Sequence, residues 1–423
     1  MVEGDNMKDN RYISKSVNKV QVLLMVETLI LTVGGLTFIS EQFYKVFTAL
    51  CMWGAFAYLP WRYRKIKDVS AHFRYCIYLL MLFGVFTIIH ALINRDDPYL
   101  DSLGNRYLTL FGNVLMAPLM LLPIFGLFST NLINQHFIKR VVFIISISLI
   151  FMYIYPTNLN NSYILIFFLL PFLPLMSKNN KIDSRFIILL ILVIVSMTYY
   201  AFVGDNPTRT NLIYIGFMFL LLANHIVFGK NRKLIYILFV FIIFFIGYSF
   251  YLAIYENSSI IAQLSGIIDS EGTNVDATDT RTFLYAEVLQ DLLGSNSIWI
   301  GKGAYCHYYS EFFAMSQTGN GDFWQRNGVE VDFLNLMLKG GLIYIILYLY
   351  IVINSIYKAL KKSNSKFMKD VAVVLIGFFF VGFISSVGIV SLTSIAPWIL
   401  IGLCNSEKWL SYNDSQIKKI LVR

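Results

Sequence analysis

Two carboxylates separated by one residue stand directly before a long apolar segment of the chain. They are Glu330 and Asp332, in the run GVEVDF from 328 to 333. A carboxylate beside an acceptor site can act as a general base and take the proton of an incoming hydroxyl. Acidic residues near a helix N-terminus also cap the helix and complement its dipole. Both residues are candidate catalytic bases. The pattern favours capping for Asp332 and leaves both roles open for Glu330.

Three basic residues are candidates for binding a diphosphate. Arg209 opens an apolar segment, Arg281 opens a stretch with helical periodicity, and Lys302 lies between two glycines that allow close approach of a ligand. A helix N-terminus attracts phosphate, and an arginine adds a two-pronged group that matches phosphate oxygens. The alternative roles are a local ion pair with a neighbouring aspartate and anchoring at the membrane surface.

Aromatic residues with amide and carboxylate neighbours follow Lys302 along the chain. Tyr305, His307 and Trp324 are the candidates for contact with a sugar ring, and His307 is also a reserve candidate for the base. Such residues more often form the core of a small subdomain or an interfacial belt. Lys339 and Glu27 fall inside apolar segments. Ionisable residues in such places are functional candidates, and each is also a possible partner for the other.

The segments that must position these residues are strongly apolar. Apolar residues make up 57% of the 423-residue chain and charged residues only 14%, whereas soluble domains carry about 25% charged residues. Runs of about 20 uncharged residues recur, each long enough to cross a bilayer as a helix. The sequence therefore predicts an all-α polytopic integral membrane protein with about 12 (10–12) transmembrane helices. The expected spans are 20–40, 43–61, 73–93, 107–127, 141–155, 163–176, 186–203, 210–228, 234–255, 333–357, 371–388 and 389–404.

The distribution of charge predicts the orientation of these helices. If the N-terminus is cytoplasmic, 26 of the 34 lysines and arginines fall on the cytoplasmic side. This asymmetry satisfies the positive-inside rule and places both termini in the cytoplasm of a multi-pass protein of the cytoplasmic (inner) membrane. The net charge of +9 is then a topology signal, and no nucleic-acid partner is expected.

One connection is far longer than the others and lies on the external (periplasmic) side. It covers residues 256–332, and long loops of this kind usually carry function. Within it, apolar residues recur at helical spacing between 279 and 294, which predicts an amphipathic helix on the outer membrane surface. The expected divisions are the N-terminal cytoplasmic tail 1–19, helices one to nine in 20–255, the external loop 256–332, helices ten to twelve in 333–404 and the C-terminal cytoplasmic tail 405–423.

The cysteines and histidines indicate no metal site. Of the four cysteines, only Cys306 falls on the external side, so an external disulfide within one chain is excluded. No spacing typical of metal ligands occurs among the Cys and His residues.

Taken together, these features resemble bacterial O-antigen polymerases of the Wzy type, within the wider O-antigen polymerase and ligase family. The resemblance covers mainly residues 200–357 and rests on the order of its motifs along the chain. These are Thr208-Arg209-Thr210, Thr280-Arg281, Gly301-Lys302-Gly303, Glu330-Val331-Asp332-Phe333-Leu334 and Lys339-Gly340-Gly341-Leu342-Ile343. The ligases have a histidine where this chain has its two carboxylates, which favours a polymerase.

The resemblance implies a metal-independent membrane glycosyltransferase without a cofactor. Its substrate would be undecaprenyl diphosphate carrying an oligosaccharide. The growing glycan would move to the terminal sugar of a new lipid-linked unit on the outer side of the membrane. Arg209 and Arg281 would hold the diphosphate, and Glu330 would take the acceptor proton. Membrane lipids and a chain-length regulator protein are further expected partners.

Two other functions remain open from the sequence. One is a ligase that moves the glycan to a lipid or cell-wall acceptor. The other, from a different class, is a flippase or transporter of lipid-linked oligosaccharides. Transporters usually show internal repeats and charged or broken helices at the midplane. No similarity is evident between residues 1–210 and 211–423, which favours the enzyme.

Overall fold

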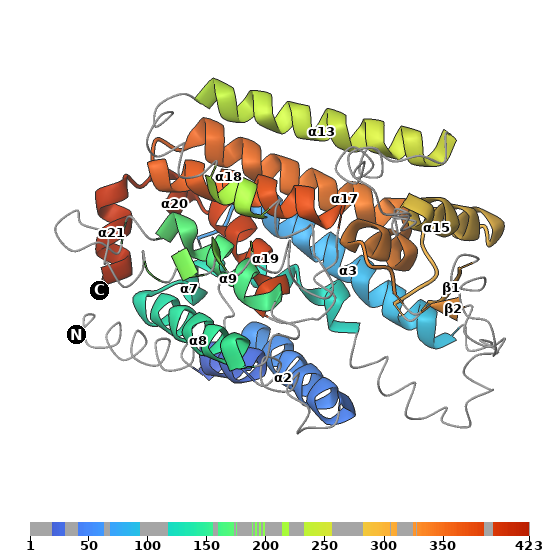
Figure 1. Cartoon of the computed structure of the whole chain (residues 1–423), viewed down its shortest axis with the longest axis horizontal. Helices are drawn as coiled ribbons and strands as arrows, with labels where there is room; N and C mark the ends of the chain where they lie inside the picture. Colours follow the sequence, from blue (N-terminus) through green and yellow to red (C-terminus); the bar gives the residue numbers. More distant parts are fainter. Residues whose placement is uncertain are drawn as a thin grey trace, which may run out of the picture.

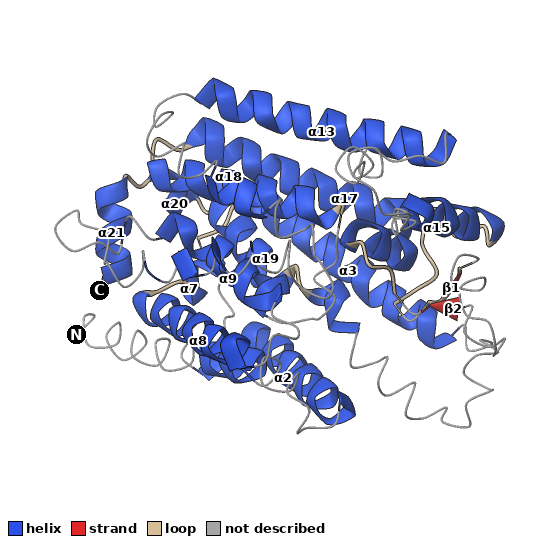
Figure 2. Cartoon of the chain, viewed as in Figure 1, coloured by secondary structure: helices blue, strands red, loops and turns tan. Residues whose placement is uncertain are grey.

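The computed structural model describes most of the chain, and the described part is almost entirely helical (Figure 2). The described residues are 19–29, 41–62, 68–93, 117–154, 160–172, 214–219, 232–255, 282–304, 306–310, 325–326, 328–384 and 392–422, with single positions between 175 and 198. The predicted all-α fold is therefore confirmed for the described part.

Most of the helices between residues 41 and 255 follow the predicted apolar segments, with one main exception. They are α2 (Glu41–Arg62), α3 (Ala71–Ile93), η1 (Ala117–Leu121), α6 (Ile124–Leu127), α7 (Ser129–Leu132), α8 (Gln135–Ile154), α9 (Asn160–Leu169), η2 (Leu170–Phe172) and α13 (Arg232–Tyr255). The exception is the predicted span 107–127. Its described part is a series of short turns, because Pro118 and Pro123 each remove a backbone donor and interrupt a regular helix.

The C-terminal half contains the only strands found in the described residues. Its elements are α15 (Thr282–Gly294), β1 (Tyr308–Tyr309), β2 (Gln325–Arg326), α17 (Asp332–Lys362), α18 (Lys366–Gly382), α19 (Leu392–Cys404), α20 (Glu407–Ser411) and α21 (Asp414–Val422). The strands pair antiparallel, with Tyr308 opposite Arg326. Figure 1 shows α15 and this small sheet at one end of the long axis, and α20 and α21 at the other.

The centre of the bundle is α19, which packs against α17, α18 and α9. Nearly all of its residues are buried. Outer helices carry apolar side chains on their exposed side as well. In α13, Ile237, Val240, Phe241 and Phe244 are all exposed, although the helix also packs against α18 (Figure 1). A helix that is apolar on every side is typical of a membrane environment.

Two of the described helices are long and apolar enough to cross a membrane. They comprise residues Ala71–Ala91 and Asp332–Lys362. The total of about twelve spans stays a prediction, since several expected spans lie partly outside the described residues.

The predicted C-terminal tail is folded against the bundle. Trp409, Ile417 and Leu421 are buried in the main core. The carboxylate of Asp414 accepts hydrogen bonds from the Ser365 hydroxyl and from two backbone N–H groups at the start of α18. A carboxylate stabilises a helix N-terminus through these unpaired donors and the helix dipole. The tail therefore closes this end of the bundle.

Helix α17 is broken near its N-terminal end. Gly341 has φ +67° and ψ −170°, which interrupts the helical backbone between two helical segments. A side chain is strained at such a φ, so glycine is the residue suited to this position. The break separates a short first segment of α17, which carries Asp332, Asn335 and Lys339 among apolar residues, from its long apolar remainder, and residues 298–304 contact the break.

Candidate functional site

Backbone hydrogen bonds fasten the external loop into the break of α17. The N–H of Lys302 donates to the carbonyl of Leu338 over 2.8 Å, and the N–H of Gly303 donates to the carbonyl of Lys339 over 3.1 Å. The carbonyls that end a helix have no partner within it and require one elsewhere. The loop therefore supplies hydrogen-bond donors to the backbone carbonyls that end the first half of the broken helix.

The same loop supplies hydrogen-bond acceptors to the backbone N–H groups that begin the second half of α17. The N–H groups of Leu342 and Ile343 donate to the carbonyls of Ile298 and Trp299, over 2.9 and 3.2 Å. These N–H groups begin a helix and would otherwise be available to an anion. Because the loop occupies them, the break itself is not an anion site in this structure.

Two glycines make this close contact possible. A Cβ atom on Gly301 would lie 2.5 Å from the backbone of Lys339, and one on Gly341 would lie 2.4 Å from the backbone of Trp299. The loop also reaches α3, where the N–H of Ala304 donates to the carbonyl of Thr87 over 3.0 Å. In the Gly301-Lys302-Gly303 motif, Gly301 thus serves close packing of backbone on backbone.

The amphipathic helix is present as α15, but its apolar face is buried by protein. Leu284, Val288 and Leu292 are fully buried in a small core formed with Cys306 and Leu338. These three residues therefore pack against protein, and the position of the helix on the outer membrane surface stays a prediction. A surface helix would turn that face to lipid, whereas here the external loop and α17 cover it.

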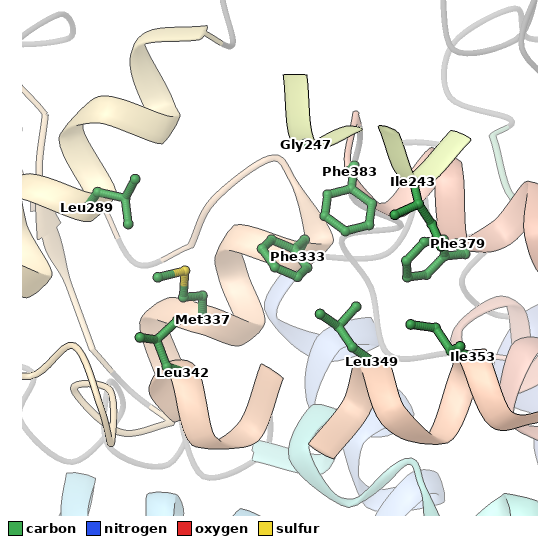
Figure 3. Close-up of a pocket in the computed structure, with 10 residues that line it drawn as sticks. All are labelled: Ile243, Gly247, Leu289, Phe333, Met337, Leu342, Leu349, Ile353, Phe379 and Phe383. Carbon is green, nitrogen blue, oxygen red and sulfur yellow. The ribbon is translucent and has the colours of Figure 1, made fainter. Parts of the chain in front are cut away.

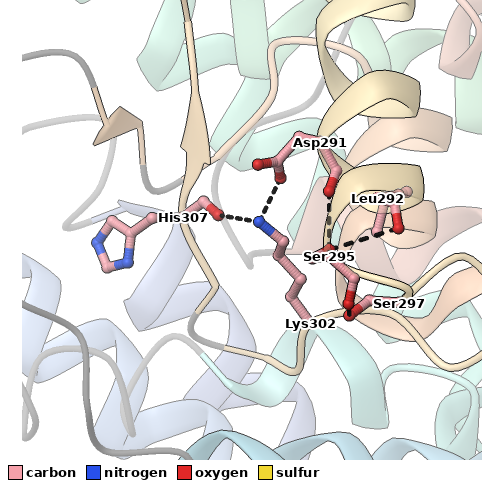
Figure 4. Close-up of polar contacts among 6 residues, drawn as sticks. All are labelled: Asp291, Leu292, Ser295, Ser297, Lys302 and His307. Carbon is pink, nitrogen blue, oxygen red and sulfur yellow. Dashed lines mark hydrogen bonds and ion pairs between the residues drawn. The ribbon is translucent and has the colours of Figure 1, made fainter.

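Lys302 forms an ion pair inside the external subdomain. Its ammonium lies 2.5 Å from the carboxylate of Asp291 in α15 and donates to the carbonyl of His307 over 3.5 Å (Figure 4). The charge that was expected to meet a diphosphate is thus neutralised by a carboxylate of the same chain. In this arrangement Lys302 holds α15 against the segment that leads into β1.

The two candidate bases differ in their surroundings. Glu330 is exposed, directly before the helix, whereas Asp332 is half-buried in the first turn of α17. The N-cap residue is Val331, so the predicted capping role does not belong to Asp332. Asp332 complements the helix dipole instead. Of the two carboxylates, Glu330 is the more accessible to solvent.

Asp332 faces other elements of the bundle. A Cβ atom on Gly382, the last residue of α18, would lie 3.9 Å from the Cβ of Asp332. Asp332 is also within electrostatic range of Tyr214, which stands in a helical segment that covers 214–219. This segment lies within the expected eighth span, 210–228, and begins five residues after Arg209.

Four of the predicted site residues lie outside the described residues. They are Arg209, Arg281, Tyr305 and Trp324. Arg281 directly precedes α15, and Trp324 directly precedes β2. Their proposed roles stay predictions.

His307 is buried, with 8% of its surface exposed. Its ring points away from Lys302, while its backbone carbonyl faces the lysine (Figure 4). Among the described residues, no group of three or more His, Cys, Asp or Glu side chains is placed to hold a metal ion.

Sequence analysis missed an apolar cavity of about 410 Å³ beside the break. Figure 3 shows its wall, which is built from α13, α15, α17 and α18. The volume falls in the range of small-molecule sites, and a wholly apolar wall suits a hydrocarbon chain. Its sequence signal was the apolar pair Phe333 and Met337 on one face of α17. The sequence did not show which other helices would pack opposite this pair. The lining residues are Ile243, Gly247, Leu289, Phe333, Met337, Leu342, Leu349, Ile353, Phe379 and Phe383.

The Cys306 thiol is a pH-dependent reporter of this folded loop. Burial raises its pKa from 9.0 to about 12, although the nearby Lys339 and Lys302 lower it in part. Since the thiolate is the reactive form, we expect no alkylation of Cys306 by iodoacetamide at pH 8 in the folded protein and rapid alkylation after unfolding. The contribution of this thiol to folding stability is complete below about pH 9 and is lost as the pH rises toward 12. Peptide mass spectrometry measures the modification, and full labelling of the folded protein at pH 8 would contradict the buried position.

No protein-family model matches the chain. No curated protein matches it at a significant level. Its function is therefore argued from the site.

Proposed function

We propose that this protein is a membrane glycosyltransferase that polymerises a polysaccharide on the outer side of the cytoplasmic membrane. The donor is a growing glycan on undecaprenyl diphosphate, and the acceptor is the terminal sugar of a new lipid-linked unit. One observation carries the proposal. The external loop is fastened into the break of α17, so that the carboxylates at the start of this helix and a hydrocarbon-lined cavity belong to one structural unit.

The reaction requires a base, an anion site and a place for the lipid. Glu330 takes the proton of the acceptor hydroxyl as its oxygen bonds to the anomeric carbon of the donor. The bond between that carbon and the diphosphate oxygen breaks, and undecaprenyl diphosphate leaves. Arg209 and Arg281 stabilise the negative charge that develops on the diphosphate. The apolar cavity holds part of a lipid chain.

The broken helix favours a second candidate, a transporter of lipid-linked oligosaccharides. Broken helices in transporters expose half-helix ends that bind the substrate or its coupling ion. In α17 the exposed ends are already bonded to the loop, with Lys302 and Gly303 on one side and Ile298 and Trp299 on the other. This favours the enzyme, with the break serving to seat the loop.

Deletion of the gene distinguishes these functions. We expect cells without the protein to carry a single repeat unit on the glycan acceptor, because the first unit is still attached but never extended. Gel electrophoresis and mass spectrometry of the surface glycan measure this. Loss of a ligase would leave no unit on the acceptor. Unchanged surface polysaccharide together with altered solute uptake would favour a transporter and overturn the proposal.

A further inference from the structure

The outer segment of α17 carries a polar face that includes Asp332, Asn335 and Lys339. At 100° per residue these three side chains share one side of the helix, and Lys339 lies roughly 10 Å along the axis from Asp332. Asn335 and Lys339 are both 9% exposed. Two polar residues on this face are therefore buried within the bundle end that the external loop covers.

Among the described residues, the amide oxygen of Asn335 and the ammonium of Lys339 have no hydrogen-bond or ion-pair partner. The Oδ1 atom of Asn335 is buried without a hydrogen-bond partner. The electrostatic neighbours of Lys339 are the Cys306 thiol and Asp332, and within the described part of the chain it forms no ion pair or hydrogen bond. The expected pairing with Glu27 is absent, since Glu27 accepts a hydrogen bond from Thr28 instead.

Lys302, the other lysine of this region, has a structural role and differs from Lys339. Lys302 is partly exposed and still has the carboxylate of Asp291 at 2.5 Å. Lys339 is more deeply buried, where an uncompensated charge is expensive. An acidic residue four positions before a lysine is its best counter-ion on a helix. At that position this chain has Asn335, so Lys339 has no ion-pair partner among the described residues, and the carboxylate that acts on it electrostatically is the more distant Asp332.

We propose that Lys339 binds a phosphate group of a prenyl diphosphate and that the amide oxygen of Asn335 accepts a hydrogen bond from a hydroxyl of the sugar that this diphosphate carries. This inference rests on the proposed function and assigns a part of its substrate to a new position. The ammonium becomes paired only when the ligand is present, and the amide oxygen gains the donor that the protein does not supply. Asn335 also keeps this position neutral, so that no carboxylate one turn away from Lys339 competes with the phosphate.

The test is binding of farnesyl diphosphate and farnesol to the full-length protein in phosphatidylcholine nanodiscs, measured by isothermal titration calorimetry. Asn335→Asp is nearly isosteric and provides the missing internal counter-ion. Lys339→Met removes the charge and keeps most of the side-chain length. Lys362→Met is the matched control, because it removes an exposed lysine from the other end of α17.

We expect farnesyl diphosphate to bind about 10- to 100-fold more weakly to Asn335→Asp and Lys339→Met, the loss typical of a charge-assisted contact. Binding to Lys362→Met should equal the wild type. Both site variants should melt at or above the wild-type temperature, since Lys339→Met removes the buried charge and Asn335→Asp gives it a counter-ion. If Lys339 had only a structural role, Lys339→Met would instead melt below the wild-type temperature.

The remaining outcomes separate this inference from the proposed function. If the wild type prefers farnesyl diphosphate to farnesol and both site variants bind it equally well, the assignment to Lys339 is wrong while the function stands. If the wild type does not prefer the diphosphate, both are wrong. Displacement by an equal mole fraction of phosphatidylglycerol would reassign the position to bulk headgroups and overturn the inference.

Discussion

Replacing Arg209 or Arg281 with alanine should abolish extension of the glycan, while the protein still inserts and accumulates in the membrane. Each arginine precedes a described helical segment, 214–219 for the first and α15 for the second. A diphosphate needs such positive, hydrogen-bonding positions as its charge develops. Loss of one such contact costs roughly 100- to 1,000-fold in rate. Because the charge develops in the transition state, kcat should fall more than KM rises.

Two further substitutions make this prediction specific. Lysine at either position keeps the charge but loses the two-pronged geometry, so it should restore activity only in part. Glu330→Gln preserves shape and should impair transfer without weakening binding of the lipid diphosphate. Polymer length on gels and in vitro turnover measure these effects. Polymer of normal amount and length in the alanine variants, at normal protein levels, would show that the arginines are interfacial anchors.

The second large effect is expected at the break of α17, where Gly341→Ala should displace the external loop. The new Cβ would overlap the backbone of Trp299 at 2.4 Å, and the positive φ is unfavourable for any other side chain. Overpacking and backbone strain together cost about 2–5 kcal/mol. We expect a lower melting temperature of the purified protein, loss of the iodoacetamide resistance of Cys306 and loss of polymer.

The control for this prediction is Gly216→Ala. No heavy atom lies within 4 Å of the added Cβ there, and the residue is helical. Alanine in a helix is favoured over glycine by roughly 0.5–1 kcal/mol, so this variant should be at least as stable as the wild type. A melting temperature of Gly341→Ala equal to that of Gly216→Ala would show that the loop does not depend on the break.

The sequence by itself determined where the main helices of the C-terminal half lie. The predicted amphipathic helix 279–294 corresponds to α15 (Thr282–Gly294), and the predicted span 333–357 corresponds to α17 (Asp332–Lys362). This is expected, because a helix satisfies its backbone with partners four residues away and its apolar period is visible locally. The chemistry at Glu330 was also a local inference, because an exposed acid before an apolar helix depends little on the rest of the fold.

Only the tertiary structure decided which of the charged residues are free to act. Lys302 carried the local signal of a ligand site, and a carboxylate eleven positions away neutralises it. Lys339 had an apolar context that predicted a partner in Glu27, and it has none among the described residues. Sequence spacing describes neighbours along one helix, whereas the seating of residues 298–304 in the break joins segments about 40 residues apart. Such contacts depend on backbone donors and acceptors that every residue carries, so no side-chain pattern marks them in advance.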